Sequence, residues 1–174
     1  MGPSNRATVL SARSDILDAI RRAAVPAAPP AAMVRREPDA GPLLDRFLQA
    51  LDQVGGHGVQ RRPHQSLHDV ASMLVGDGQS GTVVRGRFAV AENGAVYVDA
   101  ADLADPIDIL VAEHLLIVVP AGAIVATMHE AVRLIPPQSR CGWFQSGPSK
   151  TADIEQSLVV GAQGARTLHV ILTW

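Results

Sequence analysis

The residues best suited to chemistry lie in one short segment, QSGPSKTADIEQSL, at 145–158. A Gly-Pro pair is followed there by hydroxyl groups, a lysine and two carboxylates. The first backbone N–H groups of a helix have no partner inside the helix and carry a partial positive charge, so they bind anions. If a strand ends at Ser146 and a helix begins near Thr151, an anion would find these N–H groups together with the charge of Lys150.

Two familiar sequence motifs, one for nucleotide binding and one for a catalytic serine, do not fit this segment. A Walker A loop requires G-x-x-x-x-G-K-[ST], and only Gly147 precedes Lys150 within reach. A G-x-S-x-G elbow requires a second glycine two residues after Ser149. The simpler alternative is a capped helix, in which Ser149 or Thr151 is the N-cap and Asp153 complements the helix dipole. Anion binding and capping both stay open.

The two carboxylates of the segment would lie on different sides of the predicted helix. Residues two apart are separated by about 200° around a helix, so Asp153 and Glu155 cannot share a face. A carboxylate that points toward the sheet needs a partner, and this need often marks a functional site. We assign the following residues of the segment to a ligand or anion site: Ser146, Gly147, Pro148, Ser149, Lys150, Thr151, Asp153 and Glu155.

A second candidate site lies at the tip of a predicted β-hairpin. The segments 88–91 and 95–98 are rich in strand-forming residues, and Asn93-Gly94 between them tolerates the positive φ of a tight turn. Glu92 would then lie at the mouth of the sheet as a candidate nucleophile or general base. We assign Asn93 and Gly94 to ligand binding beside it.

The sequence offers little for a metal or a cofactor. His64 and His68 have i,i+4 spacing, but Pro63 makes the helix start uncertain and no third ligand follows from the spacing, so solvated histidines are the simpler interpretation. Cys141 is the single cysteine, which excludes an internal disulfide and an all-cysteine cluster. A buried structural thiol is its simpler interpretation, and a nucleophile is the alternative. We expect no metal and no cofactor.

Hydrophobic spacing predicts the elements that position these residues. Residues 43–54 and 66–74 have helical spacing, Gly55-Gly56 would end the first helix, and the unbroken apolar run 115–120 is typical of a buried parallel strand. Further elements are a helix at 124–135, a strand at 142–146, a helix at 151–160 and a strand at 167–173. This alternation predicts an α/β fold in which helices sandwich a mainly parallel sheet, with an antiparallel hairpin.

The first 42 residues differ from the rest. Ser14 could cap a short helix, and the following segment 25–42 is rich in proline and alanine. Because proline lacks an N–H group, that segment suits a linker or an arm better than a helix or strand. We therefore predict an N-terminal helix with a Pro-rich arm at 1–42 and an α/β domain at 43–174.

Composition and charge exclude several classes of protein. Lys and Arg number 15 against 17 Asp and Glu, for a net charge of −2. This balance argues against a dedicated nucleic-acid binder and against a polybasic membrane contact. Asp108, Glu113 and Pro120 interrupt the longest apolar region, so no membrane span is expected. Charged residues also interrupt the N-terminal segment, which does not resemble a secretory signal, and we expect a cytoplasmic protein.

Three segments together resemble the LUD domain, the LutC/YkgG family of lactate-utilisation proteins. They are FAVAENGAVYV at 88–98, EHLLIVVPAGAIVATMHEA at 113–131 and SGPSKTADIEQSLVVGAQGARTLHVIL at 146–172. The last is the most specific, because GPSKTADIE is followed by a Gly-rich turn and an LHV strand. The resemblance implies a NagB/RpiA/CoA-transferase-like fold. This chain is similar to a short form that lacks a strand–helix unit between about Ser72 and Thr82.

The resemblance also implies a function. It implies a bacterial accessory component beside two iron–sulfur subunits that oxidise L-lactate to pyruvate, and the single cysteine suits a cluster-free subunit. These subunits and a small anionic ligand are the expected partners, and a homo-oligomer stays open. The alternatives are a stand-alone small-molecule enzyme or binder that uses Glu92 and the 146–155 loop, and a regulatory scaffold. The resemblance transfers motif positions but no catalytic residue.

Overall fold

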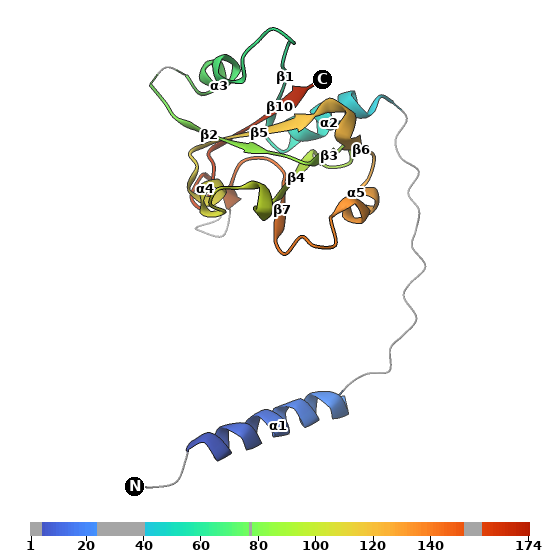
Figure 1. Ribbon diagram of the computed structural model, residues 1–174, viewed down its shortest axis with the longest axis vertical. Helices are drawn as coiled ribbons and strands as arrows, with labels where there is room; N and C mark the ends of the chain where they lie inside the picture. The colour runs from blue at the N-terminus through green and yellow to red at the C-terminus, as the bar shows by residue number, and fades with distance from the viewer. Residues whose placement is uncertain (1–4, 24–40, 77, 152–157) are drawn as a thin grey trace. The chain divides into compact units, whose positions relative to one another are not determined.

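The computed structural model describes residues 5–23, 41–76, 78–151 and 158–174. The helix α1 (Asn5–Ala23) belongs to a unit separate from the remainder of the chain (Figure 1). It has 19 residues, so Ser14 lies inside the helix and does not cap it as predicted. The prediction for the Pro-rich segment falls largely on 24–40, outside the described residues.

Four parallel strands form one sheet of the α/β domain. Their order is β1 (His57–Gln60), β10 (Thr167–Thr173), β5 (His114–Pro120) and β2 (Gly81–Arg85). The two inner strands, β10 and β5, are buried over most of their length, because each lies between two other strands and apolar residues pack against both of its faces. The prediction of a central parallel strand at 115–120 is therefore confirmed.

A second sheet of four short strands carries the predicted hairpin. Its order is β6 (Ile124–Val125), β3 (Phe88–Val90), β4 (Ala95–Asp99) and β7 (Gly142–Gln145). The strands β3 and β4 are antiparallel, with Val90 opposite Ala95, so the hairpin around Asn93-Gly94 is confirmed.

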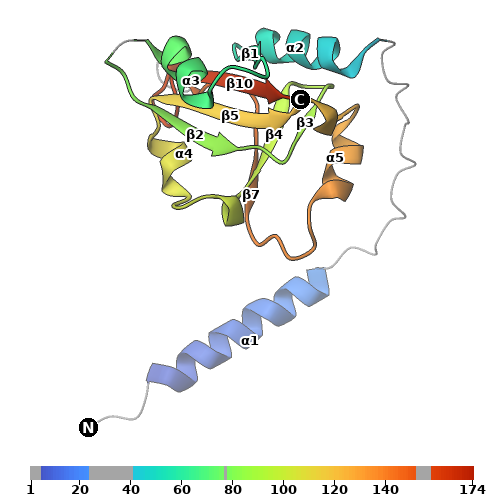
Figure 2. The ribbon, with the colours of Figure 1, turned by 45° about the horizontal axis from the view of Figure 1, so that its top comes forward.

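The two sheets share one hydrophobic core, and helices cover their other faces. Leu168, Ile117 and Val96 belong to the core between the sheets, together with Phe47 and Leu51 from α2 (Leu43–Gln53). On the far side of the parallel sheet lies α3 (Leu67–Val75), and α5 (Met128–Leu134) packs beside β3 (Figure 2). The short helices η1 (Ala100–Asp102), α4 (Ile107–Val111) and η2 (Ala121–Ala123) complete the domain. The predicted fold class, a mainly parallel sheet flanked by helices with antiparallel strands, is confirmed.

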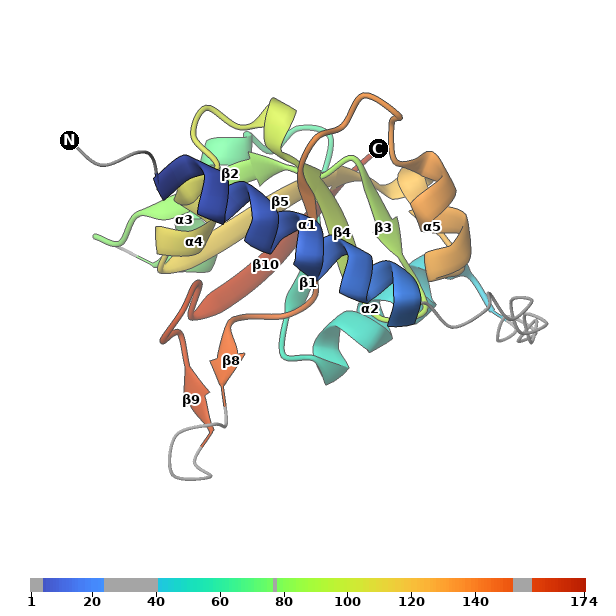
Figure 3. The ribbon, with the colours of Figure 1, turned by 90° about the horizontal axis from the view of Figure 1, so that it is seen from below.

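The predicted helix at 151–160 is wrong for its described residues. Lys150–Thr151 form β8 and Val159–Val160 form β9, and the two strands pair antiparallel. The backbone explains the difference, because the N–H of Gly161 donates to the carbonyl of Ser149 and extends this ladder. β-Branched residues also favour a strand. Figure 3 shows this hairpin projecting away from the two sheets. Residues 152–157 lie outside the described part.

The predicted helix at 124–135 begins later than expected. Ile124 and Val125 form β6, which runs parallel to β3, and the helix α5 begins at Met128. Thr127 is its N-cap, since its side chain accepts a hydrogen bond from the N–H of Glu130. The strand β7 was predicted, but it pairs antiparallel with β4 in the second sheet. The chain from 115 to 173 therefore does not form one continuous parallel crossover series.

Gly55 and Gly56 end α2 as predicted. Gly55 has a φ of +80°, and its N–H donates to the carbonyl of Asp52. The N–H of Gly56 donates to the carbonyl of Leu51. This pair of bonds is the Schellman motif, which satisfies carbonyls at a helix end.

We predict that Gly94→Ala lowers the free energy of unfolding by about 2 kcal/mol or more. Gly94 has a φ of +67°, and a Cβ there would stand 2.5 Å from the backbone nitrogen of Leu51 in α2. Chemical denaturation measures the loss. Gly122→Ala is the matched control, because no heavy atom lies within 4 Å of its added Cβ, and it should change stability by less than about 0.5 kcal/mol. Equal losses in the two variants would contradict the close approach.

Candidate functional site

The structure brings the hairpin turn and the Gly-Pro loop together. The Ser146 hydroxyl donates to the carbonyl oxygen of Asn93 at 2.9 Å. The Asn93 side chain accepts from the N–H of Ala95 at 3.1 Å, which holds the turn. Gln145 donates from Nε2 to the carbonyl oxygen of Gly147 at 2.8 Å. Two segments separated by some fifty residues, each singled out from the sequence, therefore meet through side-chain to backbone hydrogen bonds.

The carboxyl end of α2 forms the third side of this cluster. Lys150 Nζ donates to the carbonyl oxygen of Val54 at 2.7 Å. A cation is favourable there because the carboxyl end of a helix is partially negative. Gly147 has a φ of +75°, and a Cβ on it would stand 2.4 Å from the same carbonyl oxygen. The lysine that we assigned to an anion thus contacts a backbone carbonyl of the C-cap residue of α2.

Glu92 contacts the start of α5. Its Oε2 accepts from the N–H of Met128 at 2.8 Å. Glu130 Oε2 accepts from the N–H of Ala126 at 3.0 Å, and Thr127 is the N-cap. Carboxylates and a hydroxyl thus satisfy the N–H groups at the positive end of this helix. The exposed Glu92 side chain therefore helps to fix α5 to the hairpin turn.

The described part of the Gly-Pro loop does not form the helix start on which the anion site was based. The N–H of Ser149 donates to the carbonyl of Ala165 at 2.8 Å, and Thr151 lies in β8. Pro148 is half-buried between these contacts. Since the Ser149 N–H is already bonded, it is not one of the free donors that an anion would need. Asp153 and Glu155 lie outside the described residues.

A charged cluster that the sequence did not reveal joins the residue before β3 to the end of β4 and to η1. The Arg87 guanidinium makes two hydrogen bonds to the Asp102 carboxylate, one of them 3.0 Å long, and lies 3.3 Å from Asp99. Asp99 is buried and also accepts from the N–H of Ala101 at 3.0 Å. The hydrogen bond from Arg87 holds the pKa of Asp102 below its ordinary value. Charges twelve or more positions apart leave no local spacing signal.

Three histidines lie on the face of the parallel sheet that α3 covers. His57 is opposite His169, with ring centroids 5.5 Å apart, and His114 contacts the Thr167 hydroxyl through Nδ1 at 2.8 Å. Burial lowers the pKa of His169, and the neighbouring His57 and His114 lower it further. His169 Nδ1 and His114 Nε2 are buried without a hydrogen-bond partner among the described residues.

The residues considered for a metal or a nucleophile stay apart. His64 precedes α3 and His68 lies inside it, so the two do not share a helical face, and both side chains are exposed, as expected for solvated histidines. Within the described ranges, no group of three or more His, Cys, Asp and Glu residues could hold a metal ion. Cys141 is exposed, which makes the interpretation as a buried thiol wrong.

No helix in the described part of the chain has both the length and the apolar character needed to cross a bilayer.

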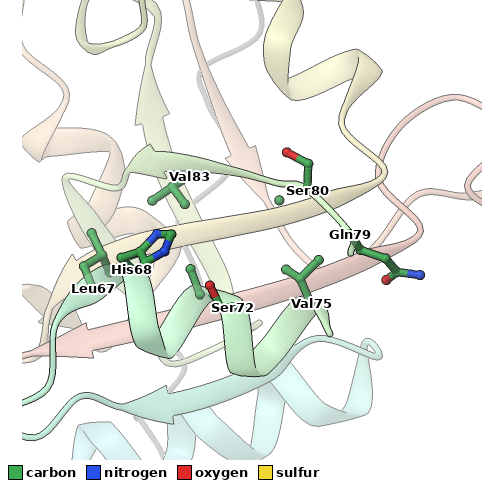
Figure 4. Close-up of a pocket in the computed structure, with 9 residues that line it drawn as sticks. Leu67, His68, Ser72, Val75, Gln79, Ser80 and Val83 are labelled. Atoms are coloured by element: carbon green, nitrogen blue, oxygen red, sulfur yellow. The ribbon is translucent and has the colours of Figure 1, made fainter. Parts of the chain in front are cut away.

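A pocket of about 440 Å³ lies between α3 and β2 (Figure 4). One wall is α3, and the other is β2 with the residues before it. Its lining comprises Leu67, His68, Ala71, Ser72, Val75, Gln79, Ser80, Gly81 and Val83. No sequence motif pointed to this pocket, although the strand-forming residues at 82–84 could have indicated an edge strand beside the predicted helix.

Comparison with known proteins identifies the family. Residues 82–173 match the LUD domain. The chain belongs to the LUD domain family. It is similar to "Lactate utilization protein C 1" of Bacillus mycoides (strain KBAB4), with 37% identity over 93 residues, which are 49% of this chain and 40% of that protein. The match thus spans less than half the length of this curated relative.

A solved structure supports the fold. The crystal structure of a DUF162 family protein from Deinococcus radiodurans aligns with a TM-score of 0.51 and 16% identity. The alignment covers 76% of this LUD domain chain and 96% of the other. At this identity the likeness concerns the fold alone.

We predict that stability falls as the pH drops below about 6.5, the ordinary pKa of histidine, because His169 has a lowered pKa in the folded state. The unfolded chain then binds the proton more readily than the folded one, and each unit of pKa difference contributes about 1.4 kcal/mol. Urea unfolding between pH 7.5 and pH 5 measures the slope, which His169→Leu should flatten. His68→Gln, at an exposed position of α3, should keep the wild-type slope. A wild-type slope in His169→Leu would contradict the assignment.

Proposed function

We propose that this protein is an accessory component of a lactate-utilisation system and acts beside iron–sulfur subunits that oxidise L-lactate. The similarity of its LUD domain to lactate utilization protein C 1 carries this proposal. The shared segment covers 40% of that relative, and the role of the relative is extended to this chain on that basis. The resemblance of the AENG turn and the GPSKTADIE segment to the family pattern supports the same role.

The geometry of the candidate site favours an accessory role over catalysis. Glu92 accepts a hydrogen bond from the start of α5, and Ser146 donates to the hairpin turn. Lys150 donates to the end of α2. A nucleophile, general base or anion clamp needs atoms that are free to meet a ligand, whereas these side chains fix the backbone of their own chain. The loop is therefore built to hold several elements in one arrangement.

The β8–β9 hairpin is the surface that we assign to the partner subunit. It projects from the domain, and Leu158, Val159 and Val160 are consecutive apolar side chains with exposed fractions of 63%, 37% and 43% (Figure 3). Contiguous exposed apolar residues are typical of protein–protein contacts. Binding of a partner subunit is accordingly favoured over binding of a small anion at this loop.

Val160→Glu should reduce the recovery of the iron–sulfur subunits with the tagged protein by about tenfold, because a charge would be buried in the contact. Recovery from cells grown on L-lactate is measured by quantitative mass spectrometry. Val132→Glu, at a position of α5 that is 55% exposed, is the matched control and should leave recovery unchanged. Normal growth on L-lactate after deletion of the gene, with no co-purifying subunit, would refute the accessory role.

A second candidate function, a small-molecule enzyme that uses Glu92, is favoured by one observation. The Glu92 carboxylate is exposed in the same turn whose Asn93 contacts Ser146. In that role Glu92 would be the nucleophile or base, with residues of the 146–155 loop around it.

Glu92→Gln separates the two candidate functions. Glutamine keeps an oxygen that can accept from the N–H of Met128, so we expect a loss of stability of less than about 1 kcal/mol. An accessory protein with this change should still support growth on L-lactate, whereas an enzyme would lose its nucleophile. Growth rates and thermal unfolding are measured together, and Glu92→Ala shows the cost of losing the cap. Loss of growth in Glu92→Gln at wild-type stability would favour the enzyme.

A further inference from the structure

The strand β2 is an edge of the parallel sheet whose outer side has no strand partner in the described part of the chain. The N–H of Gly86 donates to the carbonyl of Val118 in β5 at 2.8 Å. In a parallel ladder, alternate residues bond to the same neighbour. The N–H and C=O groups of Val84 therefore also face β5, whereas those of Val83 and Arg85 point outward. Such an edge is a template for an additional strand.

The pocket between α3 and β2 lies along this edge. Figure 4 shows Val83 and Val75 on its two walls, and Val83 is 43% exposed. Leu67 and Ala71 add further apolar surface, while His68, Ser72, Gln79 and Ser80 provide polar groups. Side chains alternate between the faces of a strand. A strand added to β2 would thus direct every second side chain into this pocket.

The charge around the pocket favours an acidic occupant. None of the nine lining residues in the described part of the chain is acidic, and Asp77 falls outside that part. Arg85 follows Val83 by two residues and so extends from the same face of β2. It makes no ion pair among the described residues, although its charge helps to lower the pKa of Asp102. Asp69 lies in the first turn of α3, but it is exposed and does not line the pocket. A guanidinium beside an unpaired strand edge suits a carboxylate.

We propose that β2 and α3 form a recognition groove for an extended acidic peptide of a partner protein. The peptide adds a strand beside β2 through the outward groups of Val83 and Arg85. An apolar side chain of the peptide enters the pocket between Val75 and Val83, and a carboxylate contacts Arg85. Peptide recognition by strand addition takes its affinity from main-chain hydrogen bonds and its specificity from such side-chain pockets.

Fluorescence anisotropy with designed peptides tests the groove on the full chain. The probe is a fluorescein-labelled decapeptide in which valine and serine alternate before two terminal aspartates. It should bind at least about tenfold more tightly than the same peptide with two lysines, because only the aspartates can pair with Arg85. N-methylation of alternate amides should weaken binding by about tenfold or more, since it removes the donors of the added strand.

Variants of the chain locate the binding edge. Val83→Pro removes an outward N–H without removing a bond to β5, and it should weaken binding about tenfold. Gln60→Pro is the matched control on the other edge, where the N–H of Arg61 bonds to Leu172 and Gln60 faces outward. Arg85→Glu should reverse the preference between the acidic and basic peptides, and the exposed Arg62→Glu should not.

Several results would overturn the groove. The first is that the folded wild-type chain does not bind the acidic peptide at peptide concentrations up to about 1 mM. Another is equal binding by Val83→Pro and Gln60→Pro. A third is a concentration-dependent dimer, seen by sedimentation, that Val83→Pro abolishes, because the edge would then pair with a second copy. If Val83→Pro does not fold by circular dichroism, the N-methylated peptides decide the question.

Discussion

The carboxyl end of α2 is the point on which the surrounding structure depends. The hairpin turn approaches its backbone at Gly94, the Gly-Pro loop approaches it at Gly147, and Lys150 donates to the Val54 carbonyl. A glycine is required at both approaches, because each has a positive φ and a Cβ would collide with the backbone of α2 or its C-cap residue. These contacts fix α2, the hairpin turn and the Gly-Pro loop relative to one another, and β3, β4, β7 and β8 extend from this junction.

The sequence predicted those parts of the fold whose signal is local. The buried strand at β5, the Asn-Gly hairpin and the glycine end of α2 depend on residues within a few positions of one another. The helix predicted at 151–160 was wrong because its apolar spacing also suits a hairpin, and the bonds that decide between them run to Ala165 and Gly161. Local spacing contains no information about such partners.

In the candidate site, too, local motifs were predictable and contacts between distant segments were not. Its residues were identified from motifs, and the contact of Asn93 with Ser146 brings the two motifs together. The motifs could not reveal that Glu92 and Lys150 would each contact the end of a different helix, because neither helix is near them in sequence. The buried histidines and the Arg87 cluster also depend on pairing between distant strands. Residue type thus indicated where polar groups gather, whereas tertiary structure determined what they bond to.

The order of strands in the parallel sheet has a kinetic consequence. β10 lies between β1 and β5, although more than a hundred residues separate it from β1. Until β10 is inserted, β1 has no strand partner in the described sheet, and β5 can pair only with β2. Closing such a long loop costs chain entropy before any contact compensates for it, which slows folding. Insertion of β10 is thus the event that converts two separate pieces of sheet into one, and during synthesis β1 must wait for most of the domain to emerge.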